Sequence, residues 1–82
     1  MKYFERVQNL EIEEKNKEGY CWMLANFDVA QEVAKRKSIK TVGDFRQAIY
    51  KEIGFAPAML FSYKHLFKSQ EVFVSALEKS FA

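Results

Sequence analysis

Apolar residues recur at helical spacing along the chain, and this pattern predicts a series of short helices. In the stretch 2–16, Tyr3 and Val7 fall on one helical face, because residues three or four positions apart share a face. The stretch 20–36 is apolar over much of its circumference, which indicates a helix pressed between neighbours. Gly19 separates the two stretches, and glycine disfavours a helix interior, so we expect one helix to end before it.

The third predicted helix has the best-defined ends. Thr41 is a favourable N-cap, and Asp44 follows it at the spacing of the acidic partner in a capping box. Gly54 stands where a helix often ends in the left-handed conformation, which glycine adopts at little cost. We therefore expect a helix over Val42–Ile53.

Two further helices complete the pattern. Pro57 marks the first turn of a fourth helix that runs to Phe67, because the N–H that proline lacks is unpaired there in any helix. Ser69 is a suitable cap for a fifth helix of about 70–81. Phe61 lies off the apolar face of the fourth helix.

The fold class expected is all-α, with residues 1–82 forming a single domain, a compact array of four to five short helices. A minor alternative is an α+β fold with an N-terminal β-hairpin, in which 9–13 pairs with 20–26 around NKEG. Leu10 and Ile12 alternate with polar residues there, and short alternations suit either structure. Residues 9–26 therefore stay open between a hairpin and helices.

Aromatic content directs attention to a protein interface. The chain is 49% apolar and 16% aromatic, which is enough for a small core, but we do not expect one small core to enclose every ring. Trp22, Phe55, Phe61 and Val74 lie off or at the edges of the expected core faces. Buried interface centres are enriched in aromatic residues. The first functional hypothesis is therefore a non-enzymatic protein-interaction or regulatory module that forms a homodimer, with Trp22, Phe55 and Phe61 in the interface.

Charge is distributed unevenly, although the formal net charge is only +2. Residues 1–34 hold four basic and seven acidic side chains, whereas residues 35–68 hold eight basic and two acidic ones. Such asymmetry suits an anionic partner or the acidic part of a second copy of the chain. Ordinary surface charge on a small domain is the alternative.

The segment 42–67 carries the spacing of two helices joined by a glycine turn. It resembles the helix-turn-helix family, in which Ile49 and Ile53 would pack inward, Gly54 would open the turn and Leu60 would anchor the second helix. In that family the second helix enters the major groove of DNA. The resemblance implies a second hypothesis, a small DNA-binding regulator.

The nucleic-acid contacts expected under this hypothesis are the basic and polar residues Lys35, Arg36, Lys37, Lys40, Ser62, Lys64 and His65. Tyr63 and Phe67 alternate with lysines, a pattern also found in proteins that bind single strands. Two residues depart from the helix-turn-helix pattern. Tyr50 stands where the family has a small residue between the helices, and Phe61 stands where it exposes base-reading side chains.

We expect neither catalysis nor a metal or other cofactor. His65 is the only histidine and Cys21 the only cysteine, and no nucleophile or further ligand stands at a spacing that would complete a site. The three glycines are scattered and form no phosphate-binding loop. With no signal-peptide pattern, no apolar run long enough for a bilayer and no possible internal disulfide, the expected location is the cytoplasm.

Overall fold

The computed structural model describes residues 2–56 and 63–81 of the chain. Its helices are α1 (Lys2–Gln8), α2 (Glu14–Ala25), α3 (Phe27–Ala34), α4 (Val42–Ile53), α5 (Tyr63–Leu66) and α6 (Gln70–Ser80). These residues include no β-strand, so the all-α prediction is confirmed and the alternative hairpin over 9–26 is wrong. The number of helices is higher than the four to five predicted, because the stretch 20–36 holds parts of two helices.

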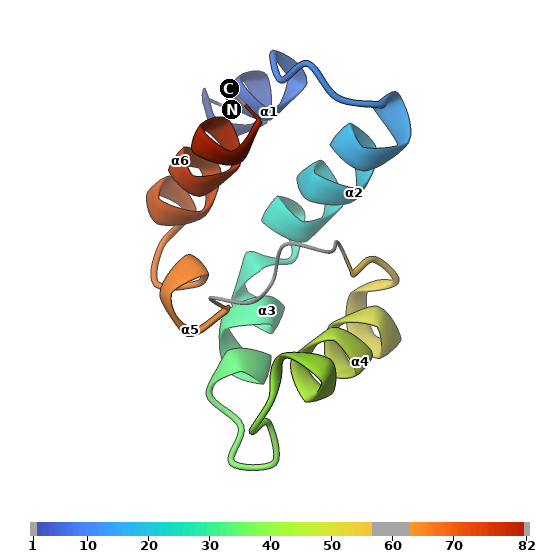
Figure 1. Ribbon diagram of the computed structural model, residues 1–82, viewed down its shortest axis with the longest axis vertical. Helices are drawn as coiled ribbons and strands as arrows, with labels where there is room; N and C mark the ends of the chain where they lie inside the picture. Colours follow the sequence, from blue (N-terminus) through green and yellow to red (C-terminus); the bar gives the residue numbers. More distant parts are fainter. Residues whose placement is uncertain (1, 57–62, 82) are drawn as a thin grey trace.

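Helices α2 and α3 follow one another through the middle of the molecule, and the other helices pack around this pair (Figure 1). At one end α1 packs on α2 and α6, and at the other end α4 packs on α3. The connection between α3 and α4 lies at the end opposite the chain termini. The molecule is 35 Å long and 21 Å across.

The N-terminal helix boundaries differ from the prediction. The first helix ends at Gln8 rather than near residue 16, and Gly19 lies buried inside α2 instead of ending a helix. At Gly19, the ring of Phe55 occupies the space that a β-carbon would fill. Glycine is present here to let another segment approach the helix, which the sequence pattern does not reveal.

The chain bends at Asn26, which ends α2 and begins α3. Its backbone angles, φ −114° and ψ 32°, are not helical. The side-chain amide donates a hydrogen bond to the Trp22 carbonyl at 2.9 Å, and the Asn26 carbonyl accepts from the N–H groups of Val29 and Ala30. Asparagine competes in this way with regular helical hydrogen bonds, so the helix predicted over 20–36 is interrupted.

Helices α4 and α6 begin as predicted, each with a capping side chain. Thr41 Oγ1 accepts from the Asp44 N–H at 3.0 Å, and Asp44 Oδ2 accepts from the Thr41 N–H at 3.2 Å, which completes the capping box. Gly54 closes α4 with a φ of 90°. At α6, Ser69 Oγ accepts from the Val72 N–H at 3.1 Å.

The fourth predicted helix is described only in part. Its described residues form α5, in which Tyr63 and Leu66 are buried. Phe61, Ser62 and the N-terminal part of that predicted helix lie outside the described residues.

Aromatic rings around Phe67 form the centre of the core. The ring centroids of Phe27, Phe45 and Phe73 lie 5.5, 5.3 and 5.3 Å from that of Phe67. Tyr63 stacks on Phe45 with a centroid distance of 4.5 Å. Each such pair contributes about 0.5–1.5 kcal/mol beyond the burial of its area. Much of the aromatic content therefore stabilises the fold itself.

Val74 corrects one prediction about α6. The sequence pattern places it off the apolar face, but it is completely buried, like its neighbour Phe73. Helix α6 packs against α1 as well as α5, so a second face of the helix is covered. A single amphipathic stripe underestimates the burial of a helix that has neighbours on two sides.

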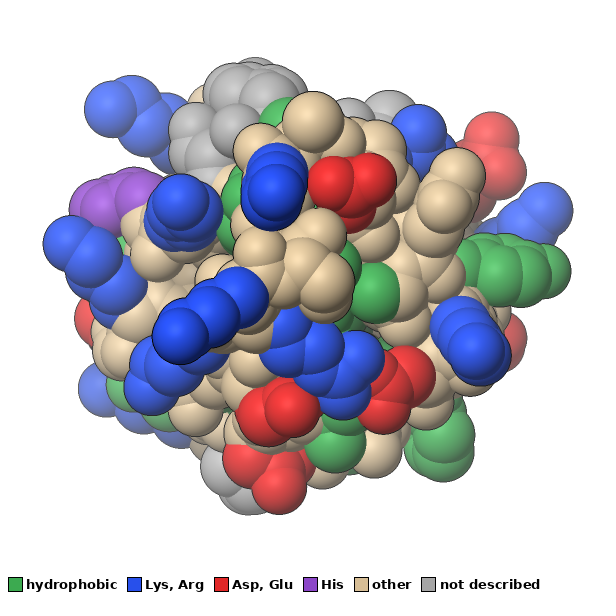
Figure 2. All heavy atoms as spheres, turned by 90° about the horizontal axis from the view of Figure 1, so that it is seen from below, with side chains coloured by type: hydrophobic (Ala, Val, Ile, Leu, Met, Phe, Trp, Pro, Cys, Tyr) green, Lys and Arg blue, Asp and Glu red, His purple; other side chains and the backbone are tan. Residues whose placement is uncertain are grey.

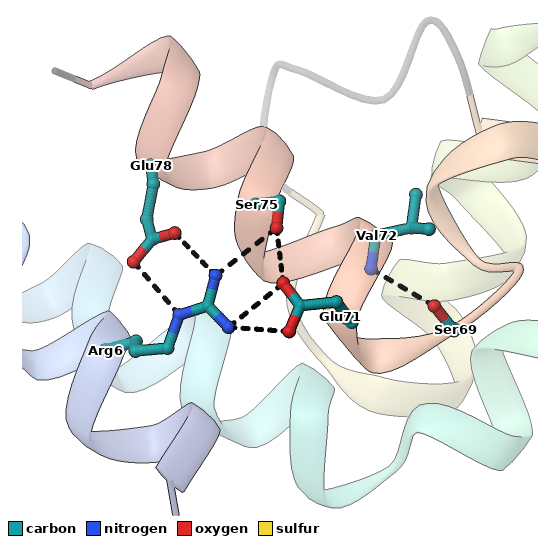
Figure 3. A network of polar contacts seen from close by, with 6 residues as sticks. All are labelled: Arg6, Ser69, Glu71, Val72, Ser75 and Glu78. Carbon is teal, nitrogen blue, oxygen red and sulfur yellow. Dashed lines mark hydrogen bonds and ion pairs between the residues drawn. The ribbon is translucent and has the colours of Figure 1, made fainter.

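Arg6 links α1 to α6 through ion pairs (Figure 3). Its guanidinium lies between two carboxylates, 3.0 Å from Glu71 Oε1 and 2.6 Å from Glu78 Oε1, and also donates to Ser75 Oγ. The hydrogen bonds from Arg6 lower the pKa of both Glu71 and Glu78. Ion pairs therefore link α1 to α6 at a partly exposed contact.

Candidate functional site

Trp22 presents an exposed ring that is held in place by a hydrogen bond. Its indole N–H donates to the carbonyl of Ile53 at 2.6 Å, in the last turn of α4. Carbonyls in that turn have no partner within their own helix, so the indole satisfies one of them. The side chain is nevertheless 55% exposed. The ring is thus a positioned apolar surface, with its one polar group already bonded.

Tyr50 is the second exposed ring, at 66% exposure. The helix-turn-helix resemblance places it between two helices, whereas in the structure Ile49 and Ile53 face inward and Tyr50 faces solvent. Tyr50 precedes Ile53 by one helical turn, so it lies near the backbone that holds Trp22. We call Trp22 and Tyr50 the aromatic pair.

Phe55, the next residue of the predicted interface, is half-buried. Its ring covers Gly19 and meets the ring of Tyr20 edge-on, with a centroid distance of 5.4 Å. Phe55 therefore packs α2 against the chain that leaves α4, and only part of its surface remains available. The third predicted residue, Phe61, lies outside the described part of the chain.

Glutamates border the aromatic pair on α2. Glu18 and Glu14 precede Trp22 by one and two helical turns, so the three side chains share a face, and all three residues are exposed. Lys17 lies 3.5 Å from Glu14 and compensates part of that charge. Lys15, which is also exposed, lies two helical turns before Trp22, so the surroundings of Trp22 along α2 carry charges of both signs.

Several lysines among the predicted nucleic-acid contacts come together near the connection between α3 and α4. Lys35, Lys37, Lys40 and Lys64 line one open depression, where the connection after α3 meets α5. Figure 2 shows lysine and arginine side chains gathered over the end of the molecule where this connection lies. A second depression adjoins the first, because Lys35 and Lys64 line both of them. Lys68 lines the second depression only. We call these five residues the lysine surface.

Arg36 differs from the lysines around it. Its guanidinium lies 2.7 Å from Glu32 Oε2 and 2.6 Å from Glu52 Oε2, so it ties α3 to α4. The hydrogen bonds to Glu32 and Glu52 raise the pKa of Arg36 above its ordinary value. The sequence predicts Arg36 as a nucleic-acid contact, and the structure shows its charge already matched within the chain.

The remaining residues singled out in the sequence are His65, Ser62 and Cys21. His65 is exposed on α5, Ser62 lies outside the described residues, and Cys21 is half-buried with its Sγ 3.6 Å from Gln8 Nε2. Over 2–56 and 63–81, no three His, Cys, Asp or Glu residues are grouped as metal ligands. None of the helices in these ranges has the length and apolar character needed to cross a bilayer.

Comparison with known proteins gives no relative to place beside this geometry. No protein-family model, no curated protein and no solved structure matches the chain.

Proposed function

We propose that this chain is a non-enzymatic protein-interaction module that binds a partner through the aromatic pair, and that it associates with a second copy of itself. The observation that carries this proposal is the hydrogen bond from Trp22 to Ile53, which holds a ring that is 55% exposed. A ring fixed in this way loses little conformational entropy on binding, because it is already ordered in the free protein.

The chemistry around the pair supports an interface. Tyr and Trp are over-represented among residues that dominate binding energies, because they bury large area with few rotatable bonds. Glu14 and Glu18 would form a polar rim beside Trp22, as in interfaces with an apolar centre and charged edges. Because Lys15 and Lys17 lie among these glutamates, a partner surface with an apolar centre and edges of both charges would fit, which includes a second copy of the chain.

Self-association can be tested by intrinsic fluorescence, since Trp22 is the only tryptophan. We expect its emission to shift to shorter wavelength as protein concentration rises through the micromolar range, because a partner ring would exclude water from the indole. Sedimentation at the same concentrations should show a dimer. A clean monomer at about 100 µM would contradict self-association.

Tyr50→Ser is the variant that tests the interface. Tyr50 is exposed, so its replacement should weaken the dimer by about tenfold or more while the thermal midpoint changes little. Gln47→Ser, on the same exposed side of α4, is the matched control. If both variants dimerise like the parent chain, the aromatic pair is not the interface.

A further inference from the structure

We infer that the lysine surface, formed by Lys35, Lys37, Lys40, Lys64 and Lys68, binds the phosphate backbone of double-stranded nucleic acid without regard to sequence. This site is distinct from the aromatic pair, and the inference does not depend on self-association. It also does not require a recognition helix, because the contacts come from the α3–α4 connection and from the region of α5.

A hydrogen-bonded contact holds the two basic segments together. Gln31, on α3, donates from Nε2 to the carbonyl of Phe67 at 3.0 Å, and Lys68 offers its carbonyl to the same amide at 3.4 Å. The ring of Phe67 also packs on Phe27 of α3. The chain near Lys64 is thus fixed against α3 beside Lys35, and the lysines share one surface before any partner arrives.

The charge of this surface is largely available. Lys35, Lys37, Lys40, Lys64 and Lys68 are all exposed. The acidic groups nearby already have partners, because Glu32 and Glu52 pair with Arg36, and the Asp44 carboxylate accepts from the N–H groups of Lys40 and Thr41. Each carboxylate still offsets part of the field, so the surface is basic by a few charges rather than by all five.

The chemistry of the surface selects the backbone of a duplex. Lysine is a compact point charge that contacts phosphates, and it makes poor base-specific contacts compared with Arg, Asn or Gln. Single-strand binding needs exposed aromatic rings between the lysines, and the two rings that alternate with them in sequence, Tyr63 and Phe67, are buried in the core. Among the residues that the structure describes, the surface therefore favours sequence-independent duplex binding.

A salt titration tests this inference. A fluorescent 20-base-pair duplex is titrated with the full chain at about 50, 100 and 200 mM salt, and a second duplex of unrelated sequence is run beside it. We expect equal affinity for both sequences and a slope of log K against log salt between about −3 and −5, which is a loss of roughly 10²- to 10³-fold over this range. No binding at the lowest salt would overturn the inference.

Charge-removing variants locate the binding. Lys37→Gln with Lys64→Gln should make the slope less steep by about two, one for each phosphate that is no longer neutralised. The matched control is Lys15→Gln with Lys79→Gln, which removes the same charge near the start of α2 and the end of α6, away from the lysine surface, and should leave the slope unchanged. Equal effects of the two double variants would show attraction by overall charge and would overturn the assignment to this surface.

Three further readouts distinguish duplex binding from other roles of the lysines. If the lysines only stabilise helix C-termini, the Lys37/Lys64 variant will lower the thermal midpoint and leave duplex affinity intact, which would overturn the inference. Tighter binding to a 20-nucleotide single strand would overturn the duplex assignment. Lysine-dependent binding to polyglutamate without duplex binding would assign the surface to an acidic protein instead.

Discussion

The ring of Phe55 lies directly against the backbone of Gly19, in the space that any larger residue on α2 would need. Gly19→Ala should therefore displace this ring and lower the free energy of unfolding by about 1–2 kcal/mol, although alanine is intrinsically better than glycine in a helix by about 0.5–1 kcal/mol. Thermal denaturation followed by circular dichroism measures the effect, which corresponds to roughly 4–16 °C in a chain of this size.

Gly43 provides the matched control, because it is also helical but exposed, with room for a β-carbon. Gly43→Ala should leave stability unchanged or raise it by up to about 1 kcal/mol. The contact itself is isolated by repeating Gly19→Ala in a Phe55→Ala background, where the loss should disappear. An equal loss in both backgrounds would place the strain elsewhere.

Acid should weaken the contact between α1 and α6. Arg6 lowers the pKa of Glu71 and Glu78 below the ordinary value of 4.5, so at mildly acidic pH the unfolded chain binds protons that the folded chain does not. The stabilisation is present above about pH 4.5 and is lost as the pH falls through the lower folded-state values. Arg6→Gln should be less stable than the parent chain at neutral pH, and this difference should shrink in acid.

Thermal midpoints of Arg6→Gln and of the parent chain, measured between about pH 7 and pH 3, test this pH dependence of stability. Glu11→Gln, which removes an exposed carboxylate between α1 and α2, should preserve the acid sensitivity of the parent chain. A difference between Arg6→Gln and the parent chain that stays constant with pH would mean that Arg6 acts through packing on Tyr3 instead.

The capping box of α4 should be worth more than the simple cap of α6. Thr41→Ala removes the hydroxyl that accepts from the Asp44 N–H, and we expect a loss of about 1 kcal/mol. Ser69→Ala removes the corresponding bond from Val72, but no side chain returns a bond to the Ser69 backbone, because residue 72 is valine. Thr41→Ala leaves the Asp44 carboxylate bonded to the backbone N–H of residue 41, so the reciprocal bond is tested by adding Asp44→Ala. Urea denaturation should show a further loss of about 1 kcal/mol in the double variant relative to Thr41→Ala, and no further loss would contradict the role of the reciprocal bond.

A polar substitution at Val74 should lower the stability of the protein as it does at a core position. Val74→Thr keeps the shape but places a hydroxyl where the structure is completely buried, so we expect a loss of about 1–3 kcal/mol. Val72→Thr makes the same change at a half-buried position of the same helix and should have a smaller effect. Chemical denaturation of the two variants compares them, and equal losses would contradict the two-sided burial of α6.

The residues that predict the fold well are those whose signal is local. Thr41, Asp44 and Gly54 act within a few positions of one another, so spacing alone locates α4. Gly19 misleads the prediction, because its role depends on Phe55, thirty-six positions away. Asn26 interrupts a helix through a bond to Trp22 only four positions away, but the apolar pattern over 20–36 continues across it and conceals the break. Periodicity also misses the burial of Val74, since it carries no information about how many neighbours a helix has.

The same difference between local signals and contacts of distant residues applies to the candidate surfaces. Trp22 can be found from the sequence because a large aromatic residue off the expected core face stands out in the pattern. The convergence of Lys35 with Lys64 has a weaker signal, two basic stretches, and no spacing rule could place them side by side. The pairing of Arg36 with Glu32 follows an i, i+4 rule, whereas its pairing with Glu52 depends on the packing of α3 on α4.

The bonds from Arg6 to Glu78 join positions 72 apart in the chain. During synthesis, α1 can meet α2 early, but the carboxylate partners of Arg6 on α6 are synthesised 65 and 72 residues later. The contact between α1 and α6 can therefore form only after α6 has left the ribosome. Until then, the apolar residues of α1 that pack against α6 remain exposed and can be bound by chaperones. A chain whose translation stalls before Glu71 lacks both carboxylate partners of Arg6.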